Sequence, residues 1–302
     1  MQVQRVVQVQ KMSENGWNRL GWQGISFLKP KEWELGRVEG DEERGYLRLD
    51  DHLFNRMELR WQKQVRLSLE KVLARYVRGL RKTARKRRVD FRIMNERNYQ
   101  TKTIKGKYFM YSNTVNLVAH CEKSSRLLMA CVFGKRGEHI EKKAEKIFRS
   151  LRNRTGDDET LWAVFDFGFT TPCELKLSKH SFLSGHLRLD FLRGEDSFIF
   201  EQLSIANILL KGKSLSQWAR EFCRSQFRNV DIEVGYPREG SSEEGIYTVG
   251  REHGKVRFIK KRFFRSFFWH CQRTNHIFGV AELVRKKDEA CLDKLVSGVK
   301  CH

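Results

Sequence analysis

The chain of 302 residues has little of several features that would narrow its class. It contains only three prolines, which excludes a long proline-rich linker. No apolar run reaches the roughly 20 residues that a membrane-spanning helix needs, and residues 1–10 lack the apolar core of a signal peptide. We therefore expect an intracellular, cytoplasmic protein without a membrane span.

Catalytic and redox motifs are also missing. The seven cysteines are odd in number and widely spaced, and none forms a Cys-x-x-Cys pair, so we expect free thiols rather than a disulfide framework. The chain has no glycine-rich phosphate loop, no Gly-x-Ser-x-Gly nucleophile motif and no paired-histidine motif. These absences predict no cofactor and favour a protein that is not an enzyme.

What the sequence does contain is a pattern that occurs twice. Gly45-Tyr46-Leu47-Arg48-Leu49-Asp50 recurs 140 positions later as Gly185-His186-Leu187-Arg188-Leu189-Asp190. Trp33-Glu34-Leu35 recurs at the same offset as Cys173-Glu174-Leu175, and His120-Cys121 recurs 150 positions later as His270-Cys271. Three anchors in one order predict an internal duplication. Features found in only one copy are then the better candidates for function.

Each copy shows hairpin strands, a helix, further strands and a closing helix. The strands expected in the first copy are Ile25–Leu28, Trp33–Val38, Tyr46–Asp50, Met57–Trp61, Val89–Ile93, Lys107–Tyr111, Val115–His120 and Leu127–Phe133. Hairpins and helices mixed in one unit predict an α+β fold: two tandem copies of one antiparallel-sheet-plus-helices module in a pseudo-twofold arrangement. The expected domains are residues 1–154, strongly basic, and residues 155–302, near-neutral with a local basic cluster.

This order of strand, hairpin, helix, meander and helix resembles the PsbP-like α/β/α sandwich, separately in each half of the chain. The resemblance is one of element order. It implies a non-catalytic binding or assembly module in each half.

Positive charge is concentrated in the first copy. Up to Thr155 the chain has 36 lysines and arginines against 17 acidic residues, a net charge of +19. The remainder has 23 against 20, a net charge of +3. A concentrated positive field attracts polyanions, of which nucleic acid is the commonest, while an anionic membrane surface or an acidic protein are the other possible partners.

The charge follows one face of the helix predicted in the first copy. Leu69, Val72, Leu73, Tyr76, Val77 and Leu80 form its apolar stripe. The opposite face carries a basic row, extended toward the C-terminal end by further cations; the full set is Lys71, Arg75, Arg78, Arg81, Lys82, Arg85, Lys86, Arg87 and Arg88. Basic residues in the last turn also complement the helix dipole. Because like charges at i, i+4 repel, the unrelieved row favours neutralisation by bound phosphates.

A second basic cluster is predicted in the second copy. It consists of Lys255, Arg257, Lys260, Lys261, Arg262 and Arg265, with phenylalanines interleaved. Basic residues with exposed aromatics form stacking platforms for unpaired bases. For Phe267–Trp269 we prefer the alternative that they belong to the core.

Two further patterns give weaker hypotheses. His120-Cys121 and His270-Cys271 contain zinc-ligand residue types, but adjacent strand residues point to opposite faces, so we predict no metal site there. Asp166 with Glu174-Leu175-Lys176 is similar to the acidic–Glu-x-Lys pattern of metal-dependent nucleases. The first copy keeps the glutamate but not the lysine, which weakens that reading.

The leading hypothesis is a non-catalytic nucleic-acid-binding protein, RNA ahead of DNA, that contacts mainly phosphates and takes part in a ribonucleoprotein assembly. No helix-turn-helix or zinc-finger signature predicts base reading. The alternatives are an assembly module that binds an acidic protein and a metal-dependent nuclease.

Overall fold

The computed structural model describes residues 13–64, 68–153, 159–234, 245–252, 262–286 and 289–300. The chain forms two compact units, Met1–Asp166 and Phe167–His302, which are described separately below. The boundary expected between residues 154 and 155 falls in a stretch, 154–158, that lies outside the described residues.

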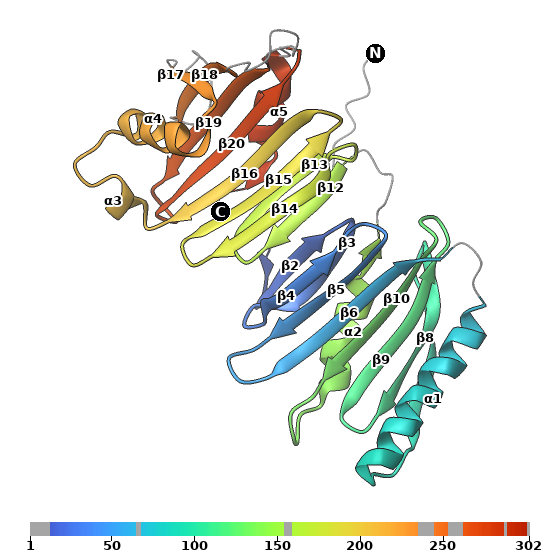
Figure 1. Cartoon of the computed structure of the whole chain (residues 1–302). Helices are drawn as coiled ribbons and strands as arrows, with labels where there is room; N and C mark the ends of the chain where they lie inside the picture. The colour runs from blue at the N-terminus through green and yellow to red at the C-terminus, as the bar shows by residue number, and fades with distance from the viewer. Residues whose placement is uncertain are drawn as a thin grey trace, which may run out of the picture. The chain divides into compact units, whose positions relative to one another are not determined.

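Unit 1 is built on an antiparallel sheet of seven strands (Figure 1). In spatial order these are β4 (Glu34–Gly40), β5 (Arg44–Asp50), β6 (Asn55–Lys63), β10 (Arg126–Phe133), β9 (Thr114–Cys121), β8 (Ile104–Tyr111) and β7 (Ile93–Gln100). Further strands of the unit are β1 (Ser13–Glu14), β2 (Trp17–Trp22), β3 (Ile25–Pro30), β11 (Arg152–Asn153) and β12 (Glu159–Val164). Its helices are α1 (Leu69–Arg87) and α2 (Ile140–Ser150).

The two faces of the unit 1 sheet differ because successive strand residues point to opposite sides. One face carries rows such as Leu47, Leu59, Ala130 and Leu117, all buried, and is covered by α2, whose Phe148 ring lies 6.2 Å from Tyr108. The other, outer face carries rows such as Arg48, Glu58, Cys131 and Asn116. Helix α1 packs on this outer face.

Unit 2 contains a second seven-stranded antiparallel sheet with the same connectivity. Its spatial order is β14 (Lys176–Leu183), β15 (His186–Arg193), β16 (Asp196–Ser204), β20 (His276–Val284), β19 (Phe263–Cys271), β18 (Gly245–Glu252) and β17 (Val230–Val234). The unit also contains β13 (Phe167–Pro172), β21 (Val299–Lys300), α3 (Ala206–Leu209), α4 (Leu215–Gln226) and α5 (Glu289–Ser297). The sequence duplication itself remains a prediction.

One anchor of the sequence pattern has the same local structure in both units. In β5 the Arg48 guanidinium donates to Asp50 Oδ2 at 2.8 Å, and in β15 Arg188 Nε donates to Asp190 Oδ1 at 2.7 Å. Each pair lies at i, i+2 on one face of its strand, as the period of two requires. Asp50 and Asp190 therefore hold a neighbouring cation.

The outer face of the unit 2 sheet is closed by α4. Trp218 and Phe222 of α4 stack at 4.8 Å, and both rings meet Phe268 of β19 edge-on, at 5.6 and 5.7 Å. Ile277 and Ala281 of β20 and the Cys223 side chain complete this core. Phe267 and Trp269 are buried on the opposite face of β19, which agrees with the expectation that Phe267–Trp269 belong to the core.

The predicted α+β class is wrong: the chain is mostly β, with large antiparallel sheets and few helices. Most expected strands exist, but several are longer than predicted, and β2 was not expected at all. Strand β7 illustrates why the strand content was underestimated. All but two of its eight residues are exposed, so its sequence shows no alternation of apolar and polar positions. Residues 89–92, expected in that strand, precede it.

Among the residues that the structure describes, no helix is both long and apolar enough to cross a membrane.

Candidate nucleic-acid interface

Helix α1 has well-formed ends. Ser68 is the N-cap, and its Oγ accepts a hydrogen bond from the Lys71 backbone N–H at 3.3 Å. At the other end Arg88 adopts the left-handed conformation (φ 54°), and its backbone N–H donates to the carbonyls of Ala84 and Arg85. These two caps satisfy backbone groups that a helix end leaves without partners, so the helix keeps its 19 residues.

The N-terminal half of α1 is fixed to the outer face of the sheet. Val72 packs with Val118 of β9 and Leu127 of β10, and Leu69, Leu73, Tyr76 and Met129 surround them. The Tyr76 hydroxyl donates to Asn116 Oδ1 at 2.8 Å. The apolar stripe predicted from the sequence is therefore the face that contacts the sheet, which fixes the direction of the opposite face.

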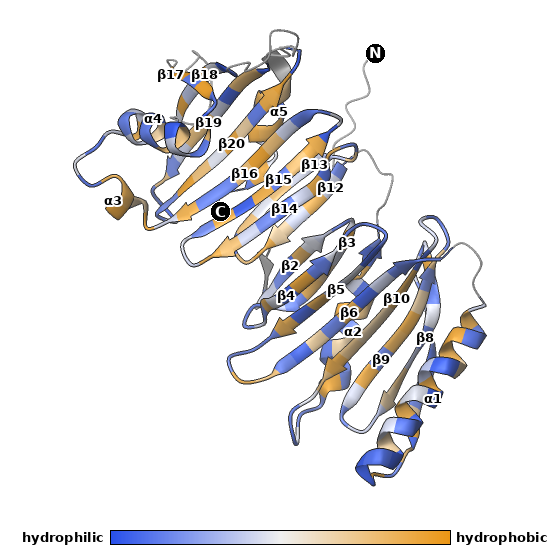
Figure 2. Cartoon of the chain, in the orientation of Figure 1, coloured by the Kyte–Doolittle hydropathy of each residue, from blue (hydrophilic) through white to orange (hydrophobic). Residues whose placement is uncertain are grey.

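That opposite face and the last turn carry the nine cations predicted from the sequence. We call them the α1 basic surface: Lys71, Arg75, Arg78, Arg81, Lys82, Arg85, Lys86, Arg87 and Arg88. All nine are exposed, and Figure 2 shows hydrophilic residues along the length of α1. The nine cations predicted in the first copy therefore lie on α1 and its C-cap residue.

Within the described parts of the chain, none of these nine side chains forms an ion pair with a carboxylate. The guanidinium of Arg81 lies over the Phe91 ring, 5.3 Å from its centroid, which leaves its charge in place. Other surface cations of unit 1 do form ion pairs, as in Lys107–Glu96 at 2.7 Å and Arg149–Glu145 at 2.7 Å. The α1 basic surface is therefore a concentration of positive charge that the described residues do not neutralise.

A cleft of about 960 Å³, called the α1 cleft below, lies between the C-terminal half of α1 and the outer face of the sheet. Tyr76, Leu80, Thr83 and Arg87 line it from the helix. The other lining residues include Val89, Asp90, Arg92 and Met94 after the helix, Glu58 and Arg60 of β6, Tyr111 of β8, Thr114 and Asn116 of β9, and Met129, Cys131 and Phe133 of β10. Nothing in the sequence predicts this cleft, because its walls come from separate segments.

The floor of the α1 cleft holds neutral polar groups. Asn116 Nδ2 donates to Thr114 Oγ1 at 3.2 Å. Burial raises the pKa of the Tyr76 hydroxyl well above its usual value and raises the pKa of the Cys131 thiol to about 12. Both groups are protonated at neutral pH, so Cys131 is a weak hydrogen-bond donor there and not a thiolate nucleophile.

A second hollow, of about 640 Å³, adjoins the cleft through shared lining residues Arg60 and Met129. It reaches the β4–β5 hairpin, where Arg44 and Tyr46 line it. The guanidinium of Arg60 lies 5.4 Å from the centre of the Tyr46 ring. Arg60 also pairs with Glu58 at 3.6 Å, and Arg37 pairs with Glu39, so this hollow holds aromatic side chains and cations that are mostly paired.

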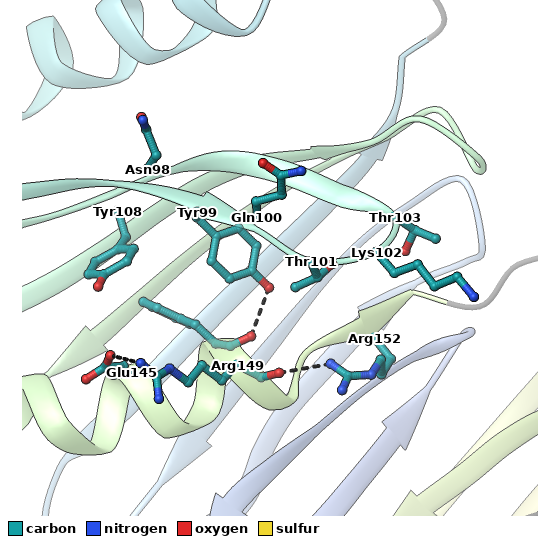
Figure 3. Close-up of a pocket in the computed structure, with 11 residues that line it drawn as sticks. Asn98, Tyr99, Gln100, Thr101, Lys102, Thr103, Tyr108, Glu145, Arg149 and Arg152 are labelled. Carbon is teal, nitrogen blue, oxygen red and sulfur yellow. Dashed lines mark hydrogen bonds and ion pairs between the residues drawn. The ribbon is translucent and has the colours of Figure 1, made fainter.

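A third hollow, of about 550 Å³, lies between the β7–β8 hairpin and α2 (Figure 3). Its cations are Lys102, Arg149 and Arg152. Arg149 pairs with Glu145, Arg152 Nη1 donates to the Arg149 carbonyl at 2.9 Å, and the Tyr99 hydroxyl donates to the Phe148 carbonyl at 2.8 Å. Most of its polar groups are thus engaged within the protein, and we assign no function to it.

The second predicted cluster is only partly described. Lys255, Arg257, Lys260 and Lys261 lie outside the described residues. Arg262 donates to both carboxylate oxygens of Glu252, at 2.7 and 2.9 Å, and Arg265 is buried against Glu282 of β20. These two arginines are held by carboxylates of neighbouring strands, so they do not extend the basic surface of the protein.

The described residues contain no group of three or more histidine, cysteine or acidic side chains placed to hold a metal ion. Cys121 and Cys271 are buried, while His120 and His270 are half-buried. Asp166 belongs to unit 1, and Glu174 and Lys176 belong to unit 2. The nuclease pattern of these three residues therefore remains a prediction from the sequence.

No family model matches the chain, and no curated protein matches it.

Proposed function

We propose that the protein is a non-catalytic nucleic-acid-binding protein, RNA ahead of DNA, that holds the phosphate backbone on the α1 basic surface. It acts within a ribonucleoprotein assembly in the cytoplasm. Its affinity comes mainly from phosphate contacts and from displaced counterions, and it therefore falls steeply as salt is added.

One observation carries the proposal. Nine exposed cations share one helix, and no carboxylate among the described residues pairs with any of them. Cations three and four positions apart repel one another, so the row costs stability in the free protein. A bound chain of phosphates removes this repulsion, which is why the arrangement suits a polyanion better than a single small anion.

The same reasoning sets the mode of binding. The N-terminal half of α1 is fixed to the sheet by its apolar face, so its basic face points away from the sheet and is available to a ligand. Lysine and arginine contacts to phosphates position a nucleic acid without reading its sequence. We expect weak dependence on base sequence and strong dependence on ionic strength.

Charge reversal on the two comparable helices tests the proposal. Arg75→Glu, Arg78→Glu and Lys82→Glu together should abolish binding to a single-stranded RNA in fluorescence anisotropy, since they replace three attractive contacts by repulsion. The thermal transition should barely move, because these side chains are exposed. The matched control, Arg220→Glu with Arg224→Glu on the exposed face of α4, should lose much less. Equal losses from both variants would contradict the proposal.

Purification separates nucleic acid from an acidic protein partner. A nucleic-acid-binding protein should carry material that absorbs at 260 nm and is stripped by about 1 M salt. If the stripped material is protein alone, and anisotropy shows no binding to RNA or DNA at low salt, the α1 basic surface serves an acidic protein and the proposed function is wrong.

A further inference from the structure

The α1 cleft begins where the charge of the α1 basic surface is densest. Arg87 belongs to both, because its exposed side chain lines the cleft from the last turn of the helix. Arg92, also exposed, lines the cleft after the helix. A phosphate held by Arg87 would therefore lie at the edge of the cleft.

The walls of the α1 cleft are apolar. Leu80, Met94, Tyr111, Met129 and Phe133 line it. Val89 and Met94 are 53% and 38% exposed, so apolar side chains at the cleft are accessible to a ligand. A flat aromatic ligand that enters here covers them and contacts the ring of Tyr111.

The interior of the α1 cleft combines charged side chains of both signs with neutral polar groups. Glu58 and Asp90 line it together with Arg60, which pairs with Glu58 at 3.6 Å. The amide of Asn116 and the hydroxyl of Thr114 are neutral, and Tyr76 and Cys131 stay protonated at neutral pH. These groups bond to one another, since Tyr76 donates to Asn116 and Asn116 donates to Thr114. They form a neutral floor between apolar walls that suits the ring faces of a nucleobase, while the arginines at the edge suit its phosphate.

From this arrangement we propose that the α1 cleft receives an unpaired base of a single-stranded nucleic acid whose phosphates lie on the α1 basic surface. This inference rests on the proposed function and names its substrate as single-stranded. A volume of about 960 Å³ is at the upper end of the size of ligand sites, roughly 300–1,000 Å³, and accommodates a nucleoside. A base inside a duplex is stacked and paired, so it cannot reach these walls.

The test compares strands that differ only in their bases. Fluorescence anisotropy is measured with an oligoadenylate of about 12 nucleotides, as RNA and as DNA, and with an abasic strand of the same length and charge. The wild-type protein should bind both oligoadenylates about tenfold more tightly than the abasic strand, because base stacking contributes roughly 1–3 kcal/mol per base. A 2-aminopurine in the strand should lose fluorescence on binding as it stacks in the cleft.

A variant that fills the cleft separates base binding from phosphate binding. Thr83 is exposed on α1, lines the cleft, and donates its hydroxyl to the Gly79 carbonyl at 3.1 Å. Thr83→Trp should reduce oligoadenylate affinity about tenfold, to that of the abasic strand. Ser225→Trp on α4 is the matched control, since Ser225 is likewise exposed and donates to the Phe222 carbonyl at 2.7 Å, and it should change neither affinity.

The outcomes distinguish the two proposals. If the wild-type protein binds abasic and base-bearing strands equally, or if Thr83→Trp weakens both equally, the base site is refuted while the phosphate surface stands. If no strand binds even at low salt, both proposals fail. Tighter binding of a duplex than of either single strand also refutes the base site.

Discussion

The two units share a strand order but differ in what covers the outer face of the sheet. In unit 2 the short helix α4 lies on Phe268 with two stacked aromatic rings of its own, Trp218 and Phe222. In unit 1 the longer helix α1 is fixed by Val72 and its neighbours at one end, and a cleft opens under the other end. The same connectivity is therefore closed by apolar packing in one unit and left open beside cations in the other.

The difference shows where function can be accommodated in such a sheet. Aromatic packing stabilises a face but leaves no room on it, whereas a helix that packs over half its length keeps its remaining surface for a ligand. The cost to unit 1 is exposed apolar surface and like-charge repulsion along α1. Under the function proposed above, a bound single strand would relieve both.

The largest effect that sharpens this comparison is expected in the unit 2 core. Phe268→Ala removes the ring that both aromatic residues of α4 contact, and it should lower the free energy of unfolding of unit 2 by about 3–5 kcal/mol. Val72→Ala under α1 should cost less than half as much, since it removes fewer buried atoms. Chemical denaturation of the full chain measures both, and a larger loss for Val72→Ala would contradict the difference in packing.

The next effect concerns the buried cations within each unit. In unit 1, Arg56 is buried and pairs with Glu138 at 2.6 Å. In unit 2, Arg265 is buried and pairs with Glu282. Although burial alone would raise the pKa of Glu138, the Lys135 backbone N–H and the Lys143 and Arg56 cations lower it from 4.5 to about 2. Because solvent screens part of this interaction, Glu138→Gln should lower the free energy of unfolding by roughly 1–2 kcal/mol at pH 7.

The pH dependence of this cost follows from its sign. A lowered folded-state pKa stabilises the protein above the unfolded value of 4.5, and that stability is lost as the pH falls from 4.5 toward 2. The difference in stability between the wild-type protein and Glu138→Gln should shrink over this interval in denaturation curves measured at several pH values. A difference that stays constant would mean that Glu138 acts through packing and not through its charge.

The smallest effect tests whether α1 needs flexibility. Gly79 lies in the middle of the helix, and a Cβ added there would meet no atom within 4 Å. Gly79→Ala should stabilise α1 by about 1 kcal/mol without changing the affinity for single strands. Hydrogen exchange of the α1 amides measures the gain. A loss of affinity with the gain in stability would show that binding depends on bending at this glycine.

Much of the local structure could be predicted from the sequence. The apolar stripe from Leu69 to Leu80 predicted the face of α1 that contacts the sheet, and the strand predicted at Val115–His120 lies within β9 (Thr114–Cys121). The fold class could not be predicted, because strands such as β7 lie mostly exposed and show no alternation. Because such strands show no pattern, the sequence underestimates the share of strand in the chain and predicts an α+β fold.

The candidate site divides in the same way. The cations of α1 are contiguous in the chain, so their spacing alone placed them on one surface. Asn116, Arg60 and Met94 all line the cleft, but they come from three different strands, and only the pairing of those strands brings them together. Arg262 and Arg265 were predicted to bind nucleic acid because they belong to a run of basic residues. Their carboxylate partners, Glu252 and Glu282, lie on neighbouring strands, and the sequence does not reveal the register of those strands.

The salt dependence of binding tests the central claim most directly. Arg75→Gln, Arg78→Gln and Lys82→Gln together remove three cations without adding repulsion, and the dependence of log affinity for a single strand on log salt is compared with that of the wild-type protein. If each cation holds one phosphate, the slope should become shallower by about two. An unchanged slope would show that the α1 basic surface does not bind phosphates.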